Sequence, residues 1–194
     1  MKRYGLKRPF LLFVGNIEPR KNLSRLIRAF RTLNPPGIDL VLAGRLAWLW
    51  KEILHEAQHP QSIGKVHLLN YVKEDDLPAL YQAALAFVYP SLMEGFGLPV
   101  LEAMASGAPV VVSNLEPLAS MVGEAARLVS PEDADDWQSA LSEIIASPDK
   151  RKMLAEAGKA RATHYSWDLA ARETRKCYEI ALSGPDRPIG FYRS

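Results

Sequence analysis

Short apolar runs alternate with helix-forming stretches along the 194 residues of the chain, and this alternation constrains the fold more than any other feature. Runs such as Phe10–Val14 end at a glycine, a proline or a polar residue, as buried parallel strands do. Stretches such as Asn22–Leu33 repeat apolar side chains at helical spacing. The pattern predicts strands at 10–14, 39–43, 66–69, 86–89, 109–112 and 126–129, and helices at 22–33, 49–58, 77–84, 99–106, 117–122, 134–146, 148–164 and 167–182.

Strands that alternate with helices form a parallel sheet covered on both faces. Because the crossovers are right-handed, we predict an α/β fold: a doubly wound, Rossmann-like parallel sheet with C-terminal helices. Residues 9–182 are expected to form this domain, residues 1–8 to be a linker remnant and residues 183–194 a flexible tail. Ligands of such sheets bind outside the carboxyl ends of the strands, so the site is expected there.

The charge is unevenly distributed, although its net value is only +2. Residues 1–31 hold nine Lys or Arg and a single acid, Glu18, which suits a phosphate-bearing ligand. The bases are not interleaved with stacking aromatics, so no nucleic-acid partner is expected. Trp48 and Trp50 leave a peripheral membrane contact open, but a packed helix is the preferred interpretation. No signal peptide or membrane span is indicated, and we expect a cytoplasmic protein.

The sequence EGFGLPVLE, residues 94–102, follows the fourth predicted strand. Gly95 and Gly97 let the backbone approach a ligand closely. The free N–H groups where the next helix begins, near Pro99, form an anion site that a diphosphate fits. The alternative is a tight strand-to-helix turn, and the glycines together with the position at a strand end argue against it.

Two carboxylates flank this turn. Glu102 can accept hydrogen bonds from ribose hydroxyls, and Glu94 can meet sugar hydroxyls or a positive charge that develops at the anomeric carbon. After the first strand, Arg20 and Lys21 can neutralise a diphosphate, since Arg offers a planar fork and Lys a point charge. A capped helix start with exposed bases, with Asn22 as the N-cap, explains that second segment equally well.

Five segments follow one another along the chain: VGNIEPRKN, LVLAG, LPALYQAA, YPSLMEGFGLPVLEAMASGAPVVVSN and GEAA. Together they resemble the C-terminal, donor-binding domain of the retaining GT-B glycosyltransferases of family GT4. The resemblance covers roughly residues 9–182, and EGFGLPVLEAMASGAPVV is its most specific part. It implies a domain that binds a nucleotide-diphosphate sugar as substrate, with no cofactor and no metal.

The resemblance also implies a role for each matching residue. Glu94 is expected to be catalytic, and Glu102 to bind the ribose. The other implied sites are Arg20, Lys21, Gly15, Asn16, Gly97 and Leu98 for the donor diphosphate, Glu94, Gly95, Phe96 and Gly97 for the sugar, and Gly44, Tyr71 and Val72 for the base.

The implied activity is transfer of a hexose, with retention of configuration, to an unknown acceptor. The EPRKN form favours mannose and GDP-mannose as donor, with a UDP-sugar as the alternative. An N-terminal acceptor-binding domain is expected to be absent from this chain, which would then be a poorly active fragment. A non-catalytic nucleotide-sugar-binding module or subunit is the other hypothesis, and a sugar-nucleotide epimerase a further one. A metal site at Asp133 and Asp135 is not favoured, because acids are expected in a first helical turn.

Overall fold

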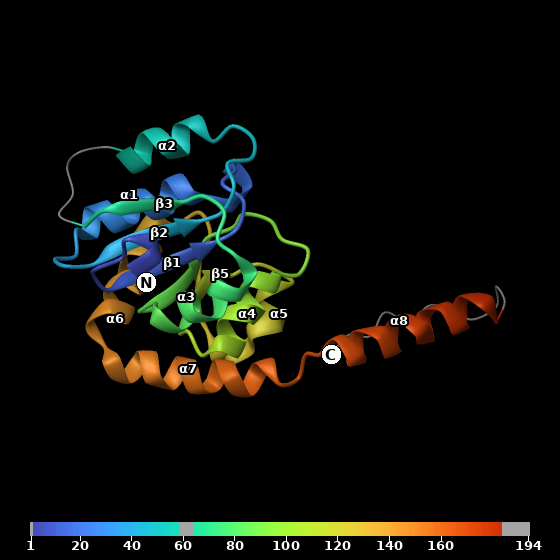
Figure 1. Ribbon diagram of the computed structural model, residues 1–194. Coiled ribbons are helices and arrows are strands. Elements are labelled where there is room, and N and C mark those ends of the chain that lie inside the picture. Colours follow the sequence, from blue (N-terminus) through green and yellow to red (C-terminus); the bar gives the residue numbers. More distant parts are fainter. Residues whose placement is uncertain (1, 59–63, 184–194) are drawn as a thin grey trace. The chain divides into compact units, whose positions relative to one another are not determined.

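The computed structural model describes residues 2–58 and 64–183 (Figure 1). The chain divides into two units, residues 1–162 and residues 163–194, and each is described by itself. Within the predicted tail, residues 184–194 lie outside the described residues, so that expectation stays a prediction. The predicted limits of 9–182 for one domain likewise stay a prediction.

Six parallel strands form the sheet of the first unit, in the order β3-β2-β1-β4-β5-β6. The central strands are uniformly apolar because helices cover both of their faces. The chain leaves β1 in one direction to β2 and β3 and resumes on its other side at β4, so the order reverses between β1 and β4. The strands are β1 (Phe10–Val14), β2 (Asp39–Ala43), β3 (Val66–Leu69), β4 (Ala86–Tyr89), β5 (Val110–Ser113) and β6 (Arg127–Val129).

Helices lie on both sides of this sheet, and Figure 1 shows α2 on one side and α7 on the other. Helix α1 packs against α2 and α6, and α4 packs against α3 and α7. The predicted α/β, doubly wound, Rossmann-like architecture is therefore confirmed. The helices are α1 (Leu23–Leu33), α2 (Lys51–Gln58), α3 (Leu77–Ala83), α4 (Leu98–Ser106), α5 (Leu118–Val122), α6 (Ala134–Ala146) and α7 (Pro148–Ala162), with 3-10 turns η1 (Lys2–Tyr4), η2 (Pro19–Lys21), η3 (Glu74–Asp76) and η4 (Gly123–Ala125).

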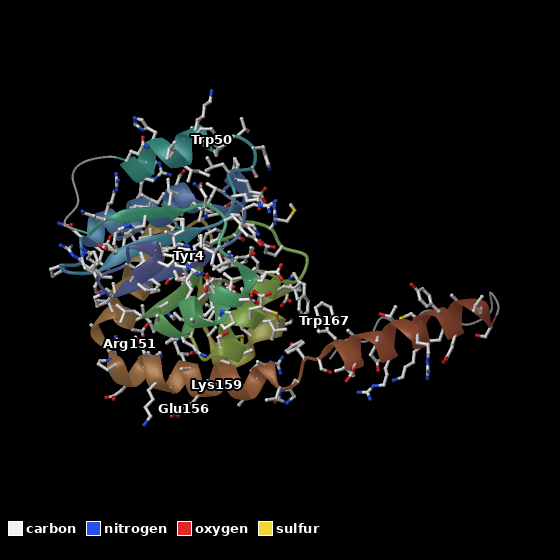
Figure 2. All side chains as sticks on the ribbon, in the orientation of Figure 1. Tyr4, Trp50, Arg151, Glu156, Lys159 and Trp167 are labelled. Atoms are coloured by element: carbon white, nitrogen blue, oxygen red, sulfur yellow. The ribbon has the colours of Figure 1, made fainter. Side chains whose placement is uncertain are left out.

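Local chemistry explains where several helices begin and end. The Asp133 side chain accepts from the backbone N–H groups of Asp135 and Asp136, which caps α6 and accounts for an acid at this position. Gly107 ends α4 in the left-handed conformation, as expected. The Arg151 guanidinium on α7 donates to the carbonyls of Ile144 and Ile145 near the end of α6 (Figure 2).

Asn22 occupies the N-cap position of α1, which the sequence offers as an alternative interpretation of this segment. Its backbone is left-handed, however, and its side chain makes no cap hydrogen bond. Its amide instead donates to the carbonyl of Pro131, 2.8 Å away, and its Oδ1 accepts from Arg25. A long-range contact therefore takes the side chain away from the helix start, and local sequence gives no sign of that contact.

The segment before β1 is packed onto the first unit. The Tyr4 hydroxyl, labelled in Figure 2, donates to Asp76 Oδ2 over 2.6 Å, and the Arg3 guanidinium donates to the same oxygen. The pKa of Asp76 is lowered, because both hydrogen bonds favour its ionised form. Leu6 is buried as well. Residues expected to be a linker remnant thus contribute contacts to the domain.

The second unit contains α8 (Trp167–Leu182), as predicted from the sequence. Ser166 caps its start by accepting from the backbone N–H of Leu169. Every residue of this helix is exposed. Among the described residues, no helix is both long and apolar enough to span a membrane.

Candidate donor site at the carboxyl edge of the sheet

The candidate site lies where β1 and β4 end. These two strands flank the point at which the strand order reverses, and in doubly wound sheets the crevice at such a point is where ligands bind. Gly15 follows β1 directly, and the loop after β4 leads through residues 90–97 to α4. The fold therefore brings the two predicted phosphate-binding segments to neighbouring strand ends.

Gly44 and Gly15 allow the loops after β2 and β1 to touch. A Cβ on Gly44 would lie 1.8 Å from the carbonyl oxygen of Gly15, so no larger residue fits without moving the backbone. Backbone hydrogen bonds continue the contact, because Ile17 donates to the carbonyl of Arg45 and accepts from the N–H of Ala47. The two loops consequently form one tied surface beside the site.

Lys21 and Glu94 form a buried ion pair at the centre of this edge. Lys21 Nζ lies 2.5 Å from Glu94 Oε1, and the two side chains are 7% and 8% exposed. Lys21 Nζ also donates to the Tyr89 hydroxyl over 2.7 Å and sits above the Tyr89 ring. Tyr89 is the last residue of β4, so the sheet itself fixes the position of the ammonium.

Arg20 joins the same cluster from the solvent side. Its Nη1 lies 3.2 Å from Glu94 Oε1 and donates to the carbonyl of Met93 over 2.8 Å. Its backbone carbonyl accepts from the N–H of Leu92, so main chain and side chain both attach η2 to the loop after β4. The predicted pair of cations and the predicted catalytic carboxylate therefore meet.

The surroundings shift the pKa values of these groups. Burial by itself would raise the pKa of Glu94, but hydrogen bonds, that of Lys21 first, and the positive charge of Lys21 together outweigh it, and the net effect is a lowered pKa. Burial and the neighbouring Glu94 charge raise the pKa of the Tyr89 hydroxyl. For Arg20, the charges of Glu94 and Glu18 outweigh burial and raise the pKa. The Glu94 carboxylate and the Arg20 guanidinium are therefore both charged at neutral pH.

The turn from Glu94 into α4 contains the helix start at which the sequence predicts an anion site. Gly97 takes the left-handed conformation directly before the helix, and a Cβ there would lie 2.4 Å from the Leu118 side chain. Gly95, Phe96 and Leu98 are exposed along the turn. Helix α4 begins at Leu98, one residue before the expected Pro99, and the N–H groups of its first turn carry the positive end of the helix dipole.

Glu102 lies on α4, where the buried Tyr81 of α3 holds it. The Tyr81 hydroxyl donates to Glu102 Oε2 over 3.0 Å, while Glu102 itself is exposed. Burial first, and then the charge of Glu102, raises the pKa of Tyr81, so the hydroxyl stays protonated and remains a donor. One carboxylate oxygen of Glu102 is thus oriented by a fixed partner.

The predicted base-binding residues lie at the ends of β2 and β3. Gly44 donates its N–H to the carbonyls of Leu69 and Asn70. Tyr71 is exposed, with the Arg45 guanidinium 5.0 Å from the centre of its ring, whereas Val72 is 6% exposed. A buried side chain cannot stack on a base, so of the predicted pair only Tyr71 presents a side chain to solvent here.

Three further residues, Glu18, Trp48 and Tyr89, contribute to this edge of the sheet, and the sequence did not identify them as site residues. The Glu18 carboxylate accepts from both Arg20 and the Trp48 indole, and Tyr89 accepts from Lys21. The one available signal was that Glu18 is the only acid within the basic N-terminal segment. Trp48 and Trp50 lie ahead of α2 rather than within it, since the helix begins at Lys51 and not near residue 49.

No metal is accounted for by the described side chains, because residues 2–58 and 64–183 contain no group of three or more His, Cys, Asp or Glu placed to hold one. The charged side chains that gather at this edge are two cations, Arg20 and Lys21, and two carboxylates, Glu18 and Glu94. The cations are the groups of this set that can pair with an anionic ligand.

Residues 2–161 match the family described as Glycosyl transferases group 1. The chain belongs to this family. It is 35% identical over 178 residues to O-antigen chain mannosyltransferase B of Escherichia coli, a match that covers 88% of this chain and 46% of that protein. It is 39% identical over 122 residues to MMP alpha-(1->4)-mannosyltransferase of Mycolicibacterium hassiacum, covering 61% of this chain and 30% of that protein.

Solved structures support the same assignment. Sucrose-phosphate synthase from Thermosynechococcus elongatus superposes with a TM-score of 0.81 at 28% identity, covering 94% of this chain and 48% of that one. An alpha,alpha-trehalose-phosphate synthase (UDP-forming) from Burkholderia vietnamiensis shares the fold, with a TM-score of 0.74 at 18% identity. The family confirms the expected GT-B type of fold. The chain spans about half the length or less of these relatives.

Proposed function

We propose that this chain is the donor-binding part of a retaining hexosyltransferase, which transfers a hexose from a nucleotide-diphosphate sugar to an acceptor. Membership of the family implies a nucleotide-sugar donor and an acceptor. The observation that carries the proposal is the meeting of Arg20, Lys21 and Glu94 at the strand-order switch, beside the start of α4.

In this proposal, the donor diphosphate binds between the two cations and the α4 start. Arg20 offers directed N–H donors, Lys21 offers a compact charge, and the backbone N–H of Leu98 adds the helix dipole. Gly15, Asn16 and Gly97 line the approach without bulky side chains. The same groups stabilise the negative charge that grows on the departing nucleoside diphosphate, and they are already in place before it develops.

Glu94 is the proposed catalytic residue. Its carboxylate shares an edge with the cations, so it can accept hydrogen bonds from hexose hydroxyls beside the phosphates and steer the sugar for transfer. A lowered pKa keeps it ionised and able to stabilise positive charge at the anomeric carbon. Gly95, Phe96 and Gly97 complete the proposed sugar contact.

The nucleoside is proposed to extend from the phosphates towards β2 and β3. Glu102, oriented by Tyr81, would accept from the ribose hydroxyls. The base would lie near Gly44 and Tyr71, with Val72 contributing through its backbone because its side chain is buried. Mannose is the proposed hexose and GDP-mannose the proposed donor, supported by the two mannosyltransferases named above and by the EPRKN segment. A UDP-sugar is the second choice.

An acceptor-binding domain is the proposed partner, since half or more of each relative named above lies outside the match. The alternative of a non-catalytic module is not favoured, because the relatives named above are transferases and synthases.

Isothermal titration of the chain against GDP, UDP, ADP and their hexose conjugates tests the proposal. We expect selective binding of one nucleotide and its conjugate, weakened at least tenfold in Lys21→Ala and in Glu102→Ala. Lys152→Ala, which removes an exposed lysine on α7, is the matched control and should bind as the parent chain does. A folded chain that binds none of these ligands would contradict the proposal.

A further inference from the structure

Glu18 is a buried carboxylate beside the candidate site, and the proposed function gives it no role. It precedes η2 in an extended backbone conformation and is 6% exposed. Removing a carboxylate from water is costly unless hydrogen-bond donors and positive charge compensate it. The partners of Glu18 therefore indicate what its burial achieves.

Both oxygens of Glu18 accept hydrogen bonds from side chains. Oε1 accepts from Arg20 Nε over 3.1 Å and from Arg20 Nη2 over 2.6 Å. Oε2 accepts from the Trp48 indole N–H over 3.1 Å. One carboxylate thus joins a cation of the proposed diphosphate site to an aromatic residue of the loop after β2.

The contact with Glu18 sets the orientation of Arg20. Guanidinium is planar, so a carboxylate that engages Nε and Nη2 also fixes the direction of Nη1. Nη1 is the nitrogen that lies 3.2 Å from Glu94 and 2.8 Å from the Met93 carbonyl. Glu18 binds the Nε and Nη2 edge of the Arg20 guanidinium, so the other edge, which carries Nη1, is directed at the site.

Trp48 attaches the other end of this arrangement. The indole is 53% exposed, although its N–H is bound to Glu18. Residues 45–47 of the same loop already bond to Ile17 through the backbone. The loop beside the proposed base site and the turn that carries Arg20 are therefore joined by main-chain and side-chain bonds.

We propose that Glu18 is a positioning residue, which holds the Arg20 guanidinium in the orientation that binds the donor diphosphate. This inference rests on the proposed function. Only a carboxylate can fill the role, because Arg20 and Trp48 are both donors and each needs an acceptor oxygen. A glutamine offers one acceptor oxygen and a donor amide that would face a donor.

Calorimetry that compares a nucleoside diphosphate with its monophosphate tests this inference. Two pairs are titrated in parallel, GDP with GMP and UDP with UMP. The ratio of the monophosphate Kd to the diphosphate Kd measures how much affinity the second phosphate adds, which is called the diphosphate gain below. We expect Glu18→Gln to reduce this gain about tenfold while the monophosphate Kd changes less than twofold. In an Arg20→Ala background, Glu18→Gln should change the gain less than twofold, since there is no guanidinium left to position.

A purely structural role for Glu18 would give other results. Equal weakening of both nucleotides, or a full effect of Glu18→Gln in the Arg20→Ala background, would overturn the inference and leave the proposed function intact. Absence of binding to any nucleotide by the folded parent chain would overturn the proposed function as well. If Glu18→Gln does not fold, Glu18→Asp replaces it: the charge stays, the reach shortens by one methylene, and the same loss of diphosphate gain is expected.

Discussion

Replacement of Lys21 by methionine tests how the buried ion pair is balanced. Methionine is shorter than lysine by the ammonium nitrogen alone and carries no charge, so Glu94 loses its 2.5 Å partner while it stays 8% exposed. Removing one member of a buried pair costs about 3–5 kcal/mol of unfolding free energy. Arg20 Nη1 remains 3.2 Å from the same oxygen, so we expect a smaller loss, about 2–3 kcal/mol at pH 7.

The loss of unfolding free energy in the Lys21→Met variant is expected to depend on pH. The pKa of Glu94 is lower in the folded chain than in the unfolded chain, where it is about 4.3. This difference stabilises the fold at pH values above about 4.3, and the stabilisation disappears as the pH falls through the pKa of the folded state. Without Lys21, the strongest influence that lowers the pKa of Glu94 is lost, and burial is opposed only by the remaining hydrogen bonds and by Arg20, so this contribution becomes smaller. The difference between the parent chain and the Lys21→Met variant should therefore shrink as the pH is lowered from 7 towards about 3.

Urea unfolding followed by circular dichroism at several pH values measures both effects. Lys152→Met is the matched control, because Lys152 is exposed on α7 and its loss should change the unfolding free energy by less than about 0.5 kcal/mol. Equal stability of the Lys21 and Lys152 variants at pH 7, or a stability difference that grows on acidification, would show that the Lys21–Glu94 pair does not stabilise the fold in this way.

Four further variants test the framework of the first unit. Gly44→Ala should cost about 3 kcal/mol or prevent folding, because its Cβ would lie 1.8 Å from the Gly15 carbonyl oxygen. Gly95→Ala, whose Cβ meets no atom within 4 Å, should change the unfolding free energy by less than about 0.5 kcal/mol when both glycine variants are measured by urea unfolding. Asp133→Ala should cost about 1 kcal/mol in chemical unfolding through loss of the α6 cap, and an unchanged midpoint would contradict that role. The raised pKa of Tyr81 means that stability falls as the pH rises above about 10, since the unfolded chain ionises first; Tyr81→Phe should weaken that slope, as measured by alkaline unfolding.

Periodicity predicted the fold closely, because a parallel sheet buries whole strands and leaves apolar runs in the sequence. Strands β1 to β4 have the predicted limits, and β5 and β6 begin one residue later than expected. Helix α7 ends at Ala162 rather than at residue 164. Helix ends are set by capping and by the packing of neighbouring elements, which a period of 3.6 residues does not encode.

The site could be predicted in part. Glycines and charged residues at strand ends indicated Arg20, Lys21 and Glu94, because parallel strands bring their carboxyl ends to one edge. Glu18, Trp48 and Tyr89 could not be found in this way. Their partners lie 2, 30 and 68 positions away, and only the folded chain shows which side chains meet. The burial of Val72 was also out of reach, since an apolar residue at a strand end can face either the core or a ligand.

Backbone amide NMR of the chain, titrated with the nucleoside diphosphate that calorimetry selects, locates the bound nucleotide residue by residue. The largest chemical-shift changes are expected in residues 15–22 and 94–98, around the Lys21–Glu94 pair, with smaller changes near Tyr71. Saturable shifts confined to another surface, such as the shallow pocket lined by Leu33, Asp135 and Ser139, would contradict the proposed donor site.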